Sequence, residues 1–172
     1  DPLYVETKKT KFPDDPKAYE YSKCKISWPI EENQSNKKES DIIIRTSLLP
    51  KEFRYKRFLG GSEDSKKRYI DRNEGISILR NDREVFYGIP PNWPRGGVSF
   101  SDNTDKNRWW GCEISFHAEI DTSFVVKNIK RGAVPKLTLR HAINDKIKGM
   151  VNQALETVND DWAKHDQKVI EE

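Results

Sequence analysis

The sequence lacks the long apolar run that a membrane-spanning helix needs, which is about 20 consecutive apolar residues. It also lacks the basic segment followed by a short apolar core that is typical of a signal peptide. Cysteine is scarce, with two residues among 172. Both cysteines, Cys24 and Cys112, stand within apolar alternations, where a free thiol behaves as a small buried hydrophobe. These absences argue against a membrane protein and a disulfide scaffold, and predict a cytoplasmic protein with reduced thiols.

The common enzyme motifs are missing as well. The phosphate-binding P-loop, the dinucleotide fingerprint, the zinc-protease helix motif and the serine-hydrolase elbow do not occur. The three histidines, His117, His141 and His165, are scattered, and zinc sites need clustered Cys and His. Cys112 and His117 are near each other in sequence but have no second pair. We therefore expect no metal site and no complete active site in this chain. Its function would then depend on residues or partners outside this chain.

What the chain does contain is typical of a polar globular domain. Charged residues make up 34% and aromatic residues 10%, which favours a folded core with generous loops over disorder. The net charge of +3 allows nucleic-acid binding without requiring it. The length fits one domain over residues 1–172. Residues 1–17 are predicted to be an extended leading segment. Because the chain opens at Asp1, we expect it to be a piece of a longer polypeptide.

Period-two alternation and β-branched runs predict the strands. Residues 23–30 and 41–46 are expected to form an antiparallel pair across a long polar loop. The clearest hairpin covers residues 75–87, where Asn81 and Asp82 tolerate the positive φ of a tight turn. Residues 110–116 form one more alternating strand. The sequence therefore predicts four or five strands, mostly antiparallel.

One long amphipathic helix is predicted from about residue 137 to 164, because apolar residues recur there at steps of three and four. Gly149 in its middle disfavours helix, so we expect close packing at that position. Residues 88–107 form a long loop, which is longer than most structureless connections. The fold class is thus α+β, with a mostly antiparallel four- or five-stranded sheet packed by the long C-terminal helix.

One candidate nucleic-acid site lies at the end of the long loop. Arg95 within it and Arg108, Trp109 and Trp110 after it have the basic and aromatic character of a single-strand stacking platform. In a strand the two tryptophans point to opposite faces, so one joins the core and only the other is free to stack. The residues favour core plus a partly covered surface for this pair, and base stacking is the alternative.

A second candidate site lies just before the helix. Residues 124–132 place three cations, Lys127, Lys130 and Arg131, in a short loop. An ordinary solvated basic loop explains this pattern. The alternative is a lysine held on a rigid element to meet an anion, most naturally a phosphate.

Four sequence motifs resemble the second domain of certain bacterial GHKL ATPases. These are residues 73–76, Arg80 with Arg83 and Glu84, residues 108–116, and residues 120–124. The superfamily includes gyrase B, MutL, the MORC proteins and a heat-shock chaperone that clamps as a dimer. The resemblance runs from about residue 72 to 139, under half of the chain.

The resemblance implies a transducer domain of the ribosomal-protein-domain-2-like fold, with a right-handed β-α-β crossover. It implies that ATP and magnesium bind to an N-terminal domain absent from this chain, and that the parent protein forms homodimers. By position Lys130 matches the family's γ-phosphate-sensing lysine, but Ile129 and Arg131 stand where Asn and Gln are expected. Lys127, or no lysine, remains an alternative sensor. The leading hypothesis is a non-catalytic transducer, and the alternative is a nucleic-acid-binding module that uses Arg95, Arg108 and the tryptophans.

Overall fold

The computed structural model describes residues 12–30, 38–89, 105–126, 133–135 and 137–171. Its main element is a mixed five-stranded sheet with the strand order β1-β2-β5-β3-β4. Strands β3 and β5 are parallel, whereas the other neighbours are antiparallel. The expected α+β class with a largely antiparallel sheet is therefore confirmed. The strands are β1 (Tyr19–Pro29), β2 (Glu39–Leu48), β3 (Ile76–Arg80), β4 (Arg83–Gly88) and β5 (Trp110–Phe116).

Two predicted strand pairs are present. Strands β1 and β2 are antiparallel, with Cys24 opposite Ile44. Strands β3 and β4 form the predicted hairpin, whose turn residues Asn81 and Asp82 have φ of 48° and 63°. A turn with both central residues at positive φ matches the right-handed twist of the strands, and Asn and Asp accept that conformation readily.

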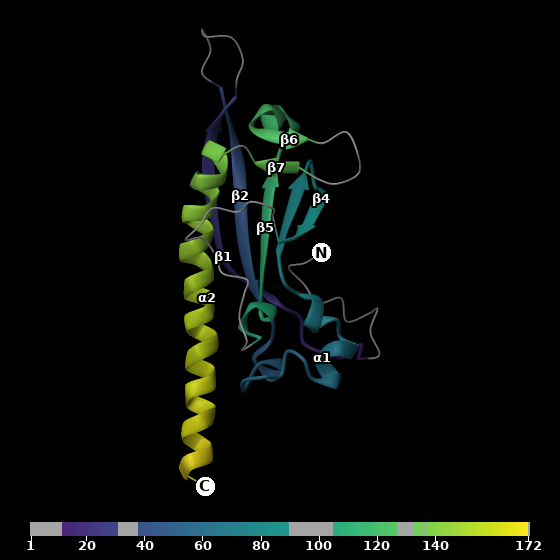
Figure 1. Cartoon of the computed structure of the whole chain (residues 1–172), viewed down its shortest axis with the longest axis vertical. Coiled ribbons are helices and arrows are strands. Elements are labelled where there is room, and N and C mark those ends of the chain that lie inside the picture. Colours follow the sequence, from purple (N-terminus) through teal and green to yellow (C-terminus); the bar gives the residue numbers. More distant parts are fainter. Residues whose placement is uncertain (1–11, 31–37, 90–104, 127–132, 136, 172) are drawn as a thin grey trace.

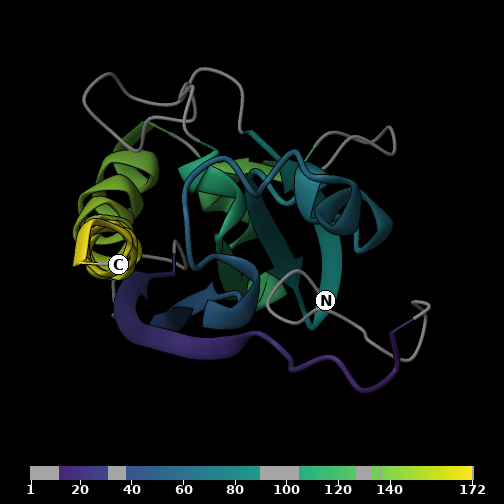
Figure 2. The same ribbon diagram turned by 90° about the horizontal axis from the view of Figure 1, so that it is seen from below.

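Helix α2 (Leu137–Glu171) covers one face of the sheet, as Figures 1 and 2 show. Its start agrees with the prediction. Its end lies beyond residue 164, because Gln, Lys and Glu continue a helix after the apolar periodicity has stopped. The last turns of α2 extend past the sheet (Figure 1). The helix buries residues at steps of three and four against β1, β2 and β5, namely Leu139, Ile143, Ile147, Val151, Ala154, Val158 and Trp162.

The expectation of close packing at Gly149 is wrong. This glycine is exposed, and a Cβ placed on it would meet no atom within 4 Å. It lies on the outward side of α2, where no neighbouring element requires a small residue. The helix tolerates the roughly 1 kcal/mol cost of glycine because the buried stripe on its other side stabilises it.

Several short elements complete the fold. Helix α1 (Glu63–Lys67) begins after Ser62, whose hydroxyl accepts a hydrogen bond from the Ser65 amide at 3.2 Å. A separate two-stranded sheet pairs β6 (Phe124–Val126) with β7 (Ala133–Pro135). The described residues also form the 3₁₀ segments η2 (Lys51–Phe53), η3 (Ile70–Arg72), η4 (Lys106–Arg108) and η5 (Ala118–Ser123).

Two expectations concerned the leading segment and the connection between the parallel strands. Residues 12–17 of the predicted leading segment have no regular structure, and residues 1–11 lie outside the described residues. The described part of the connection between the parallel strands β3 and β5 contains β4 and η4 but no α-helix. A helical β-α-β crossover is therefore not found there, and residues 90–104 of the long loop lie outside the described part.

Candidate functional site

An arginine fork lies where β3 ends. The Arg80 guanidinium donates to both carboxylate oxygens of Asp121, with Nε–Oδ1 and Nη2–Oδ2 distances of 2.8 and 2.6 Å. These hydrogen bonds raise the pKa of Arg80. Such bidentate charged pairs fix geometry as well as charge. Because Asp121 belongs to η5, the fork ties the main sheet to the segment that leads into β6.

A second set of contacts holds the same end. The Asn81 amide donates to the Phe116 carbonyl at 3.0 Å, and the Asn81 side-chain oxygen accepts from the Ala118 amide at 3.0 Å. The β3–β4 turn is therefore attached to the end of β5 and the start of η5. Together with the Arg80–Asp121 fork, these bonds give the chain before β6 a rigid base.

The β6–β7 hairpin follows this attached segment in the chain. Val126 is paired with Ala133, and Phe124 with Pro135. The candidate sensors Lys127 and Lys130 lie outside the described residues, but the strands on either side of residues 127–132 are paired with each other. Strand β7 leads directly into α2, and Figure 1 shows the hairpin at the same end of the sheet as the start of this helix.

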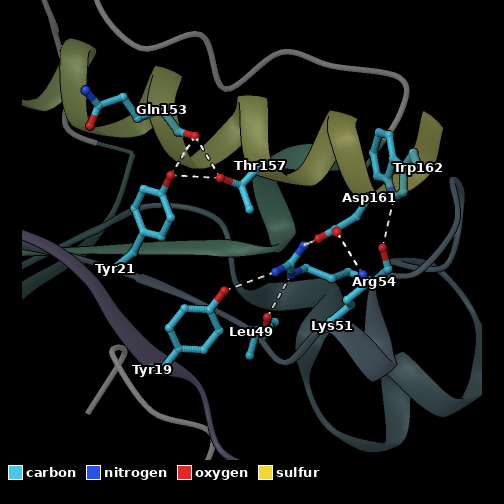
Figure 3. A network of polar contacts seen from close by, with 9 residues as sticks. All are labelled: Tyr19, Tyr21, Leu49, Lys51, Arg54, Gln153, Thr157, Asp161 and Trp162. Atoms are coloured by element: carbon cyan, nitrogen blue, oxygen red, sulfur yellow. Dashed lines mark hydrogen bonds and ion pairs between the residues drawn. The ribbon is translucent and has the colours of Figure 1, made fainter. Parts of the chain in front are cut away.

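A polar network around the buried Arg54 contacts the C-terminal half of α2, and we call it the α2 clip (Tyr19, Lys51, Arg54, Asp161 and Trp162; Figure 3). The Arg54 side chain is only 2% exposed. It donates to the Leu49 carbonyl at 2.9 Å, to Asp161 at 2.5 Å and to the Tyr19 hydroxyl at 3.1 Å. The Trp162 indole N–H donates to the Arg54 carbonyl at 2.9 Å.

The Asp161 carboxylate forms ion pairs with two cations in this network. Its second oxygen lies 3.1 Å from the Lys51 ammonium. Burial alone raises the pKa of Asp161, but the hydrogen bonds and charges of Lys51 and Arg54 outweigh burial and leave the pKa lowered. The carboxylate is therefore charged at neutral pH. The α2 clip joins the helix to β1 and to the segment after β2 through a compensated buried charge.

The candidate nucleic-acid site has a different geometry from the expected one. Trp109 and Trp110 are both buried, at 0% and 1% exposure, so neither indole is partly covered surface and the stacking alternative is contradicted. Trp109 precedes β5 and has the αR backbone of a 3₁₀ cap, so strand alternation does not apply to it. Arg108 pairs with Glu74 at 2.8 Å and with Asp105 at 3.2 Å. Arg95 lies outside the described residues.

The sheet face opposite α2 carries a polar row that the sequence did not reveal. One residue comes from each strand, in register: Lys23, Arg45, Glu113, Ser77 and Tyr87. Glu113 at its centre is 3% exposed, and its carboxylate lies 3.5 Å from the Arg45 guanidinium. The row depends on which strands are neighbours, and alternation within one strand does not contain that information.

We predict that Glu113→Gln raises the free energy of unfolding at pH 7. Burial raises the pKa of Glu113, and Arg45 only partly offsets this effect. An acid whose pKa is higher in the folded state penalises folding above that pKa, and the penalty disappears as the pH falls through it. The gain over the unsubstituted protein should therefore shrink between pH 7 and pH 4 in urea titrations.

Glu20→Gln is the matched control for this prediction. Glu20 pairs with the same Arg45 at 3.7 Å, but its side chain is 44% exposed. An exposed ion pair contributes little, so this variant should change stability by less than about 1 kcal/mol at any pH. Equal behaviour of the two variants would show that burial does not perturb Glu113.

Searches with family models, curated proteins and solved structures found no match to this chain. Both cysteines are free thiols. Among the described residues, no group of three or more His, Cys, Asp or Glu side chains is placed to hold a metal ion. The helices within the described ranges include none that is both long and apolar enough to cross a membrane.

Proposed function

We propose that the chain is a non-catalytic transducer module of a GHKL-type ATPase, with the ribosomal-protein-domain-2-like fold. In this proposal an ATP-binding domain elsewhere in a longer polypeptide holds ATP and magnesium, and the parent protein acts as a homodimer. Lys130 is the residue that senses the γ-phosphate, with Lys127 as the alternative. The module converts the nucleotide state of its neighbour into a change of conformation.

The observation that carries the proposal is the attachment of the β6–β7 hairpin to the end of the main sheet. The segment with both candidate lysines is bracketed by paired strands. The Arg80–Asp121 fork attaches the chain before that hairpin to the main sheet. A cation that distinguishes one phosphate state from another has to be positioned by a rigid support, because an error of about 1 Å removes most of its effect. This support favours a positioned lysine over a freely solvated basic loop.

A second feature supports the transmission of a conformational change from the hairpin to the far end of the domain. Strand β7 continues into α2, whose 35 residues span roughly 50 Å at 1.5 Å per residue. The α2 clip then binds residues near the far end of the helix to β1 and to the segment after β2. A displacement of the hairpin would therefore reach the opposite end of the domain through one continuous helix and one buried charge pair.

The nucleic-acid function at the long loop receives no such support. Both tryptophans are in the core and Arg108 is neutralised by two carboxylates. We therefore do not propose nucleic-acid binding by Arg108, Trp109 and Trp110.

The proposal is tested by isothermal calorimetry with ATP and magnesium. The chain alone should give no saturable heat, because the adenine pocket and the magnesium ligands belong to its neighbour. The chain joined to its upstream ATP-binding domain should bind and hydrolyse ATP. Saturable micromolar binding by the chain alone would contradict the transducer role.

A further inference from the structure

Strand β3 firmly supports the turn that follows it. Ile76 and Ile78 are 0% exposed, and β3 lies between β4 and β5 in the sheet. At the start of β3, Gly75 lies so close to Gly88 that a Cβ on it would be 2.6 Å from the Gly88 carbonyl carbon. Buried, paired strands of this kind are among the last parts of a protein to open. The turn after β3 is therefore a fixed point beside the end of β5.

The two central residues of this turn differ in one respect. Asn81 and Asp82 both have positive φ, and both are accepted there. The Asn81 side-chain oxygen accepts a hydrogen bond from the Ala118 amide at 3.0 Å. Within the described residues the Asp82 side chain has no hydrogen bond or ion pair. Only Asn81 therefore links the turn to η5 through its side chain.

The Arg80–Asp121 fork is better suited to fixing a position than to stabilising the domain. The two side chains are 35% and 32% exposed, and an ion pair this accessible contributes little to the free energy of unfolding. Its two parallel hydrogen bonds nevertheless determine both the distance and the orientation of the paired groups. In this respect the fork differs from the α2 clip, where Arg54 is almost fully buried.

The contacts from Asn81 and Arg80 reach η5 at separate places. Ala118 is the first residue of η5, and Asp121 lies further along it. Between them Ile120 is 0% exposed, so η5 also has a side chain in the core. Two attachment points and one buried side chain define where η5 lies. They consequently define where the chain enters β6.

We propose that Arg80 and Asn81 are positioning residues for the β6–β7 hairpin. They set the place where the chain leaves η5 and enters β6, and they do so without a large contribution to the stability of the domain. A group that acts on a phosphate loses most of its effect when it is displaced by about 1 Å. The consequence for phosphate sensing rests on the proposed function, whereas the positioning rests on the contacts alone.

Amide hydrogen exchange of the full chain tests the positioning, with β6 and β7 compared against β2 and β5. Arg80→Ala and Asn81→Gly should each speed exchange at β6 and β7 by roughly three- to tenfold, the factor expected for losing one such interaction. Exchange at β2 and β5 should change by less than about twofold, because a partly exposed pair adds little to global stability. Equal acceleration at all four strands would overturn the proposal, since it would show a purely stabilising role.

Two control variants separate the contacts from other effects. Asp82→Gly is the match for Asn81→Gly, because glycine accepts positive φ at both positions and only Asn81 has a bond to η5 to lose. Arg80→Lys keeps the charge but not the planar fork, so it should behave like Arg80→Ala. Equal effects of the two glycine variants would overturn the role of Asn81. Exchange in Arg80→Lys as slow as in the original chain would overturn the role of the fork.

Turnover of the chain joined to the proposed ATP-binding domain distinguishes this proposal from the proposed function. If the proposed function is right, Arg80→Ala should lower kcat roughly tenfold and leave equilibrium nucleotide binding nearly unchanged. Faster exchange at the hairpin with unchanged kcat would contradict the phosphate-sensing role and support the positioning role. Unchanged exchange at the hairpin in Arg80→Ala would overturn the positioning role, whatever the turnover.

Discussion

Asp161→Ala is expected to lower the free energy of unfolding by about 3–5 kcal/mol, because it leaves a buried guanidinium without its counter-charge. Arg54 is 2% exposed and, among the described residues, would keep the Leu49 carbonyl and the Tyr19 hydroxyl as acceptors. Removing one member of a buried pair costs more than the pair itself contributes, since the remaining charge stays desolvated. Urea denaturation at pH 7 measures the loss.

Lys51→Ala is the matched control for this loss. Lys51 contacts the same carboxylate, but its side chain is 59% exposed, so its removal should cost less than about 1 kcal/mol. The double variant Arg54→Met with Asp161→Leu should recover much of the stability lost in Asp161→Ala, because it removes both charges and fills similar volume. Equal small losses for Lys51→Ala and Asp161→Ala would contradict a buried, energetically coupled pair.

The same network makes the protein sensitive to acid. The pKa of Asp161 is lowered in the folded state, so its contribution to stability is complete above the ordinary aspartate pKa of about 4. That contribution is lost as the pH falls from there through the folded-state pKa. Glu113 has the opposite sign, because its pKa is raised. The difference in stability between Asp161→Ala and the original chain should therefore narrow below about pH 4.

If the proposed transducer role is right, Lys130→Ala is expected to lower kcat by roughly 10²-fold in the chain joined to the proposed ATP-binding domain, while nucleotide affinity stays nearly unchanged. The reason is that, in the proposed role, the contact with the γ-phosphate would form only in a closed state, whereas the contacts to adenine and magnesium would lie in the neighbouring domain. Steady-state hydrolysis together with equilibrium nucleotide binding separates the two effects.

Two further variants identify which lysine senses the phosphate. Lys127→Ala should be near neutral, and Lys130→Arg should rescue poorly because a planar fork does not replace a compact ammonium at a crowded phosphate. If Lys127→Ala abolishes turnover and Lys130→Ala does not, Lys127 is the sensor. If neither substitution changes turnover, the segment is an ordinary solvated loop and the sensing role is contradicted.

Local pattern was sufficient for the larger elements. The alternation around Cys24 and the β-branched run at Ile42 predicted an antiparallel pair, because a half-buried strand repeats every two residues. The periodic residues from Ile143 to Trp162 predicted α2. The order of the strands was not accessible in this way, since the parallel pairing of β3 with β5 depends on how distant segments meet. Strands as short as β6 and β7 carry no periodic signal.

Local pattern indicated some of the site residues but did not indicate which residues pair with each other. Arg80 and Asp121 both belong to motifs that suggested the transducer, yet their pairing depends on β3 and η5 meeting in space. Arg54 and Asp161 lie 107 residues apart and have no local signal at all. The orientation of Trp109 was misjudged because this residue caps the 3₁₀ segment η4 just before β5, so the alternation of a strand does not apply to it. Tertiary contacts decide each of these cases.

The coupling itself is tested most directly by hydrogen exchange of the joined polypeptide, with and without a non-hydrolysable ATP analogue. Exchange reports local opening along the backbone, so it can follow both ends of the domain at once. We expect slower exchange at β6 and β7 and also at residues 49–54 and 158–162, the two segments that contain most of the α2 clip. Lys130→Ala should remove both responses. A response confined to the ATP-binding domain and the hairpin, with none at the α2 clip, would contradict transmission through this chain.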